Sequence, residues 1–112
     1  MVQEIEPIAL KELLDSGAPL ILIDVREPEE HELVRLESSK LIPMMELESK
    51  IDELKDLADT SKSEVIFYCR SGARSEMAIQ YLQGVGFGAD FKNLRGGINA
   101  YAREADKSLE PY

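Results

Sequence analysis

The sequence predicts a single α/β domain, with a central parallel sheet and helices on both of its faces. Short apolar runs typical of buried strands occur at residues 20–25 and 65–68. They alternate with longer segments in which apolar residues recur at helical spacing. Strands that alternate with helices in this way imply a parallel sheet covered on both sides. Because no repeat, low-complexity tract or linker interrupts the chain, we expect residues 1–112 to form one domain.

Four segments have the composition of strands. They lie at residues 20–25, 40–42, 65–68 and 89–94. The first is almost continuously apolar, which suits a strand that is buried on both faces. The segment at residues 40–42 is weaker and ends at Pro43, which cannot donate a main-chain hydrogen bond. The run at residues 65–68 is the second strong strand, and Cys69 follows it directly.

Five segments are expected to be helical. They lie at residues 7–16, 28–34, 46–57 and 75–84, and from the Gly96–Gly97 pair to Arg103. Pro7 is tolerated in a first turn, and Gly17 supplies a stop signal for the first helix. Within residues 46–57, the apolar positions at helical spacing are Leu47, Ile51, Leu54 and Leu57. Within residues 75–84, the side chains expected to face inward are Met77, Ala78, Tyr81 and Leu82.

Charge and composition restrict the partners of the chain. It has 13 Lys and Arg against 22 Asp and Glu, a formal net charge of -9. Because binding to phosphate groups needs clustered cations, we expect neither nucleic acid nor an anionic membrane as a partner. The acidic start lacks the basic and apolar segments of a signal peptide, and no apolar run is long enough to span a bilayer. A cytoplasmic location is therefore expected.

The only cysteine, Cys69, is the candidate nucleophile. With one cysteine and one histidine the chain cannot form an internal disulfide or a Cys/His zinc cluster, and we expect no metal and no cofactor. Ligands bind at the carboxyl ends of strands in parallel sheets, where Cys69 lies. Main-chain N–H groups of the following helix, with Arg70 and Arg74, would favour a thiolate in a partly exposed, electropositive pocket. The alternative is a small buried apolar residue at a strand end.

The residues after Cys69 are expected to bind substrate. They are Arg70, Ser71, Gly72, Ala73, Arg74 and Ser75. Gly72 permits a positive φ angle, and Ser75 is placed to cap the next helix. The arginines could instead form structural ion pairs, for which the acidic candidates are Asp24, Glu27 and Glu76. We expect such pairing partly for Arg74, which would brace the loop and leave Arg70 free for substrate.

Three motifs resemble those of a known family. Residues 69–75, C-R-S-G-A-R-S, resemble the active-site loop of rhodanese-like sulfurtransferases. Residues 22–28, L-I-D-V-R-E-P, are similar to that family's D-V-R motif at a strand end, and residues 94–98, L-R-G-G-I, resemble its late L-x-G-G motif. The motifs occur in the family's order. The resemblance implies a small rhodanese-like domain in which Cys69 is catalytic and Asp24 and Arg26 support the loop.

The resemblance also implies a two-step transfer of sulfur. The Cys69 thiolate would attack the outer sulfur of thiosulfate or of a protein persulfide. The enzyme persulfide would then pass that sulfur to cyanide, a thiol or an acceptor protein. The negative charge of the chain disfavours small anionic donors at long range, which gives a slight preference for a protein donor. No general base is required, so His31 is expected to be a surface or helix-packing residue.

Residues in the middle and at the C-terminal end of the sequence indicate a particular group within this family. Residues 40–43, 46–47 and 102–109, together with the Pro111–Tyr112 pair, are similar to rhodanese domains fused behind ubiquitin-activating-like adenylyltransferases. This similarity implies a partner that is a sulfur-carrier protein or an adenylyltransferase.

Two departures from the family pattern concern other positions. The chain lacks the family's usual Gly-His pair before Ile42 and Pro43, and it has Tyr101 where many relatives have tryptophan. At helical spacing from Ile98, Tyr101 is expected to pack in the core. The neighbouring Met44–Met45 pair is expected to fill gaps in the core rather than to form a partner surface.

Two other functions remain open. Tyrosine and dual-specificity phosphatases have five residues between their Cys and Arg, whereas four lie between Cys69 and Arg74, and Ser75 stands where the longer motif needs arginine. A shorter cradle has fewer N–H groups and suits one transferred sulfur better than a phosphoryl group. Phosphatase or arsenate reductase chemistry is therefore the weaker alternative. The other is a non-enzymatic interaction module, against which the complete loop counts.

Overall fold

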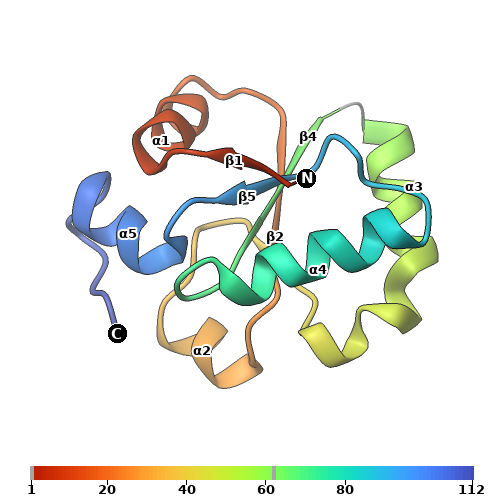
Figure 1. The fold of residues 1–112 in the computed structure, drawn as a ribbon. Helices are drawn as coiled ribbons and strands as arrows, with labels where there is room; N and C mark the ends of the chain where they lie inside the picture. Colours follow the sequence, from red (N-terminus) through yellow and green to blue (C-terminus); the bar gives the residue numbers. More distant parts are fainter. Residues whose placement is uncertain (1, 62) are drawn as a thin grey trace.

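The computed structural model describes residues 2–61 and 63–112 and contains a five-stranded parallel sheet (Figure 1). The strands are β1 (Gln3–Ile5), β2 (Leu20–Asp24), β3 (Lys40–Leu41), β4 (Glu64–Tyr68) and β5 (Lys92–Leu94). Their order across the sheet is β1-β5-β4-β2-β3, and every neighbouring pair is parallel. The predicted parallel sheet is confirmed.

Helices cover both faces of this sheet, as the sequence predicts (Figure 1). They are α1 (Pro7–Asp15), α2 (Pro28–Leu33), α3 (Ile51–Ser61), α4 (Ala73–Gly84) and α5 (Gly97–Glu104). Two 3₁₀ turns, η1 (Met44–Glu46) and η2 (Glu48–Lys50), precede α3. Among the described helices, none is long and apolar enough to cross a membrane, and the cytoplasmic location stays a prediction.

The central strands β2 and β4 lie between two cores. Ile23 and Phe67 point to one face, into a cluster that includes apolar residues of α3 and α4. Leu22 and Ile66 point to the other face, into a cluster that includes residues of α1 and α5. This alternation explains why the strands are almost continuously apolar, because a strand covered on both sides has no polar face.

Several element boundaries differ from those expected. Strand β1 was not predicted, because its first two residues are polar and exposed and it joins the sheet through main-chain pairing with β5. The helix expected at residues 46–57 begins as the two 3₁₀ turns and becomes α-helical only at Ile51. Helix α4 begins at Ala73, two residues before the expected start, and β5 is limited to Lys92–Leu94.

Some side chains predicted to be buried are exposed. Tyr101 is buried, which confirms its expected place in the core. Met77 and Tyr81 of α4 are 58% and 40% exposed, and Met45 is 91% exposed, so those predictions were wrong. The buried face of α4 consists of Ser75, Ala78, Ile79 and Leu82.

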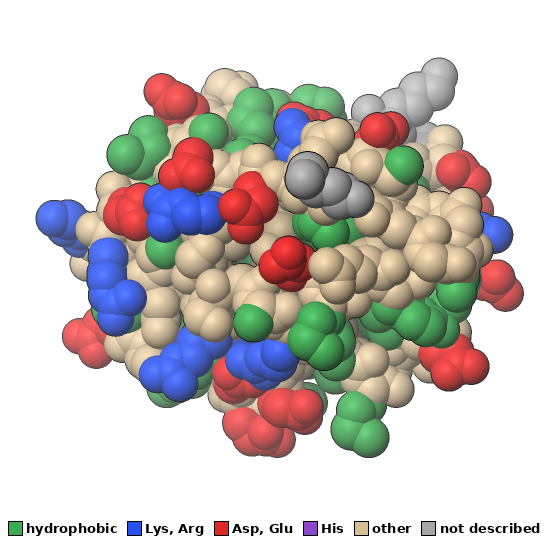
Figure 2. All heavy atoms as spheres, in the orientation of Figure 1, with side chains coloured by type: hydrophobic (Ala, Val, Ile, Leu, Met, Phe, Trp, Pro, Cys, Tyr) green, Lys and Arg blue, Asp and Glu red, His purple; other side chains and the backbone are tan. Residues whose placement is uncertain are grey.

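The misplaced apolar residues line a shallow groove between α4 and the turns before α3. Its volume is about 300 Å³, and its lining residues are Met44, Met45, Leu47, Glu48, Met77 and Tyr81. Figure 2 shows apolar side chains gathered in this region, at the lower right of the view. The sequence pattern failed here because the helical stripe of α4 points partly to this groove instead of the sheet.

Candidate active site

The loop that follows β4 forms the candidate active site. Asp24 and Tyr68, the last residues of β2 and β4, are register partners, so the two strands end side by side. From Cys69 the chain turns through Arg70 and Ser71 to Gly72, which precedes the first residue of α4. Gly72 has φ 102°, the left-handed conformation that was expected of it and that glycine adopts without steric cost.

Hydrogen-bond donors of this loop converge on the Cys69 sulfur. The Gly72 main-chain N–H donates to Sγ at 3.1 Å, and the Ser75 hydroxyl oxygen lies 3.4 Å from Sγ. Burial acts to raise the pKa of the thiol, but hydrogen bonds from the Ser75 hydroxyl and from the main-chain N–H groups of Ser75, Gly72 and Ser71 outweigh it. The pKa of Cys69 is therefore lowered, and the loop favours the thiolate.

The exposure of Cys69 differs from the expectation. The residue is only 1% exposed, so the predicted partly exposed thiol is wrong. Burial alone would fit the alternative of an inert apolar residue at a strand end. The converging N–H groups distinguish the two interpretations, because an apolar contact does not need hydrogen-bond donors around its sulfur. Cys69 is thus a buried thiol in a polar, anion-stabilising cradle.

Ser75 stabilises the loop in a different way from the one expected. The N-cap position belongs to Gly72, so Ser75 lies within α4 and the predicted cap was wrong. Its hydroxyl lies 2.5 Å from Asn93 Oδ1, 3.3 Å from Gly72 O and 3.4 Å from Cys69 Sγ. One hydroxyl proton serves one acceptor at a time, and the shortest of these contacts is to Asn93. The main-chain N–H groups are consequently the fixed donors to the sulfur.

The Gly96–Gly97 motif holds the loop from the side of α5. The N–H groups of Ile98 and Asn99 donate to the main-chain carbonyls of Cys69 and Arg70, at 2.9 and 3.2 Å. A Cβ atom on Gly97 would lie 2.3 Å from the Arg70 carbonyl oxygen and 2.6 Å from that of Cys69. Only glycine therefore allows this close approach of two backbone segments.

Arg74 is paired, as expected, but with another acidic residue. Its guanidinium donates to both carboxylate oxygens of Glu30, on α2, at 2.8 and 2.9 Å. The partners considered from the sequence, Asp24, Glu27 and Glu76, were wrong. The bonds from Arg74 lower the pKa of Glu30 to about 2, so the carboxylate stays ionised. Arg74 is thereby fixed at the start of α4.

A buried ion pair lies beneath the neighbouring strand end. Arg26 donates to both carboxylate oxygens of Asp24, at 2.9 and 2.8 Å, and both side chains are fully buried. The Tyr68 hydroxyl also donates to Asp24, and Val25 N–H donates to the Tyr68 carbonyl. Burial acts to raise the pKa of Asp24, but the bonds from Arg26 and His31 lower it overall. These bonds tie the end of β2 to the end of β4, and the support of the loop by Asp24 and Arg26 stays a prediction.

His31 belongs to the same network. Its Nδ1 atom lies 2.8 Å from Asp24 Oδ2, so it is a partner of the buried carboxylate as well as a residue packed at the end of α2. Among the described contacts none joins His31 to Cys69. Among these contacts, the partner of His31 is Asp24, and a general-base role for His31 has no geometric support.

Arg70 was expected to be free and is instead held by Tyr112. Its guanidinium donates to the main-chain oxygen of Tyr112 and lies over the Tyr112 ring, 4.9 Å from the ring centroid. The side chain is otherwise exposed. Sequence reasoning singled out Tyr112 only as part of a tail resemblance and did not place it beside the loop.

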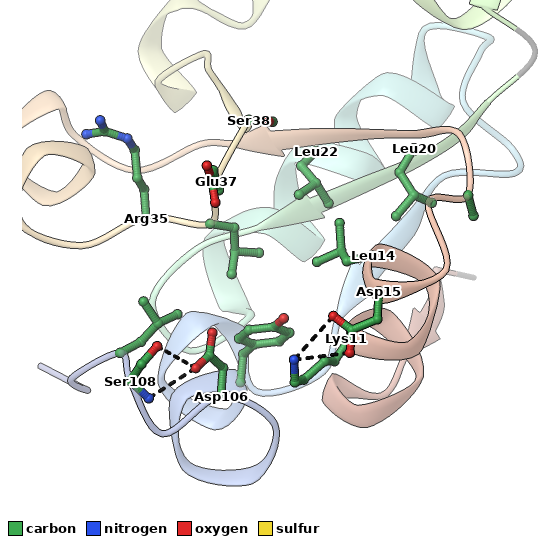
Figure 3. Close-up of a pocket in the computed structure, with 14 residues that line it drawn as sticks. Lys11, Leu14, Asp15, Leu20, Leu22, Arg35, Glu37, Ser38, Asp106 and Ser108 are labelled. Atoms are coloured by element: carbon green, nitrogen blue, oxygen red, sulfur yellow. Dashed lines mark hydrogen bonds and ion pairs between the residues drawn. The ribbon is translucent and has the colours of Figure 1, made fainter.

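A second hollow lies away from Cys69. Its volume is about 620 Å³, and it is bordered by α1, β2, residues 35–38 and the segment after α5 (Figure 3). Figure 3 shows that its charged groups include an ion pair between Lys11 and Asp15, and Asp106 bonded to Ser108. Its lining contains none of residues 69–75. The chemistry-bearing residues are thus gathered at the Cys69 loop and not here.

The fold and this loop define the class of protein. Residues 6–104 match the Rhodanese-like domain family, which is most of the chain. The chain belongs to that family, as the three motifs predicted. In the structure the D-V-R motif lies at the end of β2, the Cys69 loop follows β4, and the Gly96–Gly97 pair lies at the start of α5.

Particular relatives agree with this membership. The chain is 37% identical over 111 residues to a protein named "Sulfurtransferase" of Allochromatium vinosum, covering 99% of this chain and 98% of that protein. It is 36% identical over 109 residues to the "Probable adenylyltransferase/sulfurtransferase MoeZ" of Mycobacterium tuberculosis, covering 96% of this chain but only 26% of MoeZ. Among solved structures, a thiosulfate sulfurtransferase from Pseudomonas aeruginosa has the same fold, with TM-score 0.82, 23% identity, and coverage of 97% of this chain and 20% of that one.

Proposed function

We propose that this chain is a sulfurtransferase that carries sulfur as a persulfide on Cys69. Membership of the Rhodanese-like domain family and the 37% identical "Sulfurtransferase" support a sulfur-transfer activity in general. The observation that carries the persulfide step is the convergence of main-chain N–H groups on a buried sulfur whose pKa is lowered. A thiolate held this way is a nucleophile without a general base.

The transfer proceeds in two displacements. The Cys69 thiolate attacks the outer sulfur of a sulfane donor such as thiosulfate or a protein persulfide, and a new S–S bond forms. The donor's own S–S bond breaks, and its electron pair leaves with sulfite or with the donor thiolate. A thiophilic acceptor, such as cyanide or a thiolate, then attacks the outer sulfur of the persulfide and regenerates the Cys69 thiolate. In both steps negative charge on Cys69 sulfur is stabilised by the same N–H groups.

The loop residues bind the anionic donor. Within residues 70–75, Ser71, Gly72 and Ser75 donate to the sulfur, and the guanidinium groups of Arg70 and Arg74 supply positive charge on an otherwise acidic chain. Arg74 is committed to Glu30, whereas Arg70 has exposed N–H donors beside its contact with Tyr112. We therefore assign the direct contact with the donor to Arg70 and the bracing of the loop to Arg74, Asp24 and Arg26.

The partner proposal rests on the relatives. MoeZ is named as a joined adenylyltransferase and sulfurtransferase, and this chain spans about a quarter of its length. A sulfur-carrier protein or an adenylyltransferase, in the cytoplasm, is the proposed acceptor side of the relay. The net charge of -9 favours a protein-borne donor slightly over free thiosulfate, since long-range repulsion opposes small anions.

One experiment tests the persulfide. The protein is incubated with thiosulfate, and the intact mass is measured before and after treatment with dithiothreitol. We expect a gain of about 32 Da, one sulfur atom, that dithiothreitol removes. The matched control is Cys69→Ser, which replaces the sulfur by a smaller oxygen and cannot form a persulfide.

The outcomes separate the alternatives. No gain with thiosulfate or with a protein persulfide, together with hydrolysis of an aryl phosphate, would favour the phosphatase. No gain and no turnover of any kind would favour the non-enzymatic interaction module. A gain that persists in Cys69→Ser would contradict the assignment of the carrier, because Cys69 is the only cysteine.

A further inference from the structure

Tyr112 is linked to both arginines of the Cys69 loop. It contacts Arg70 directly, and it is connected to Arg74 through Glu30. Its hydroxyl accepts a hydrogen bond from Arg26 Nη1 at 2.8 Å and donates to Glu30 Oε2 at 2.6 Å. Glu30 is the residue that binds Arg74. The hydroxyl therefore links the buried Asp24–Arg26 pair to the Glu30–Arg74 pair at the start of α4.

The ring and main chain of Tyr112 hold Arg70. Two guanidinium groups lie over the ring, with Arg26 Cζ 5.5 Å and Arg70 Cζ 4.9 Å from its centroid. The main-chain oxygen of Tyr112 accepts a bond from Arg70, and the main-chain N–H of Tyr112 donates to Asn99 Oδ1 at 2.9 Å. Asn99 in turn donates its main-chain N–H to the Arg70 carbonyl. Tyr112 is thus attached to the same loop segment from two sides.

We infer that Tyr112 is a positioning residue of the active site, which orders the guanidinium of Arg70, the loop residue that follows Cys69, for the binding of anionic sulfur donors. An exposed arginine loses much rotamer freedom when it binds a ligand, and contacts that order it beforehand reduce that loss. The contact with the ring and the bond to the main-chain oxygen of Tyr112 order Arg70. The hydroxyl of Tyr112 holds the neighbouring Glu30–Arg74 pair in place. This inference rests on the proposed function for its substrate, but its geometry concerns only Arg70, Tyr112 and the thiol.

The test compares two alkylating reagents at Cys69, one anionic and one neutral. The rate with iodoacetate is divided by the rate with iodoacetamide, at fixed pH and ionic strength. Because Cys69 is the only cysteine, the ratio reports the positive charge near this thiol alone. Neither reagent transfers sulfur, so the ratio is readable even where the proposed function fails.

Two variants separate the ring from the hydroxyl. Tyr112→Phe keeps the ring over Arg70 and removes the bonds to Arg26 and Glu30, and we expect the ratio to fall about twofold. Tyr112→Ala also removes the ring contact, and we expect a fall of about fivefold, with a matching rise in KM for thiosulfate and little change in kcat. The control, Tyr81→Ala, changes an exposed tyrosine on α4 that has no described contact with the loop and should leave the ratio unchanged.

Three results would overturn the inference. An unchanged ratio in Tyr112→Ala, with a lowered melting temperature, would mean that Tyr112 supports only the fold. A raised ratio would mean that Tyr112 keeps Arg70 away from Cys69. An equal fall in Tyr81→Ala would mean that the effect is not specific to this position. If the wild-type protein has no activity with thiosulfate, but the ratio still falls in Tyr112→Ala, the result would count against the proposed function and not against this inference.

Discussion

The ends of β2 and β4 lie side by side, yet they present opposite chemistry. At the end of β2, the carboxylate of Asp24 accepts bonds from the Arg26 side chain and from Tyr68, and lies 2.8 Å from His31 Nδ1. At the end of β4, the sulfur of Cys69 accepts hydrogen bonds from main-chain N–H groups. The main-chain carbonyl of Cys69 accepts a hydrogen bond from the N–H of Ile98, on α5. The carboxylate at the first strand end is bound mainly by side chains, whereas the sulfur at the second is bound mainly by main-chain N–H groups, with the Ser75 hydroxyl beside them.

The two strand ends therefore have different roles: the β2 end stabilises the fold, and the β4 end stabilises the reactive thiolate. A buried carboxylate that is fully paired cannot accept a ligand without breaking the pair, so the β2 end serves to fix the strands. Main-chain N–H groups around a sulfur cannot be neutralised by a proton shift, and they stabilise whichever anion forms there. The comparison predicts that substitutions at the β2 end act on stability, and that those at the β4 end act on the thiolate.

The largest effect is expected for Asp24→Asn. It keeps the shape of the side chain but leaves the fully buried Arg26 without a counter-charge, and the free energy of unfolding should fall by about 3–5 kcal/mol. Urea unfolding measures the change. The control is Asp15→Asn, which removes an exposed i,i+4 pair with Lys11 and should cost about 0.5 kcal/mol or less. Equal effects in the two variants would contradict the bracing role of the β2 end.

A somewhat smaller effect is expected for Gly97→Ala. The added Cβ meets main-chain atoms of Cys69 and Arg70, and Gly97 has φ 67°, so backbone strain adds to overlap. We expect a loss of about 2–5 kcal/mol in the free energy of unfolding. Gly17→Ala has a similar angle, φ 74°, in open space, and should lose only about 1–2 kcal/mol. If the two variants unfold alike, the close approach of α5 to the loop is not required.

Much of this comparison is readable in the sequence, because it depends on local patterns. The apolar runs of β2 and β4 identify two buried strands, and the position of Cys69 between a strand and a helix identifies the site. Gly72 marks the left-handed turn, since few other residues adopt that angle. The parallel sheet follows from the alternation of strands and helices.

The partners of the site could not be read in the same way. Glu30, Asn93 and Tyr112 lie 44, 18 and 42 residues from Arg74, Ser75 and Arg70, and only the folded chain brings them together. Strand β1 joins the sheet through its backbone, which leaves little pattern in its side chains. The exposure of Met45, Met77 and Tyr81 depends on where the turns before α3 lie, which helical spacing does not specify.

The smallest effect concerns acid stability. The pKa of Glu30 lies at about 2, below its ordinary 4.5, so the Glu30–Arg74 pair contributes fully above pH 4.5 and is lost as the pH falls toward 2. Glu30→Gln should remove this contribution, about 1 kcal/mol for a partly exposed pair, and flatten that part of the pH profile. Unfolding free energies measured across this range, with the exposed Glu32→Gln as control, test the sign. A profile that stays as steep in Glu30→Gln would contradict the pairing.

The most direct test of the account is the pKa of the Cys69 thiol itself. The rate of alkylation by iodoacetamide is measured as a function of pH, in the folded protein and in the same chain unfolded by urea. The converging N–H groups predict that the folded protein's rate rises at a pH below 9.0, the ordinary thiol value, and below that of the unfolded chain. A folded-state pKa at or above the unfolded one would show that burial dominates, and that the loop does not hold a thiolate.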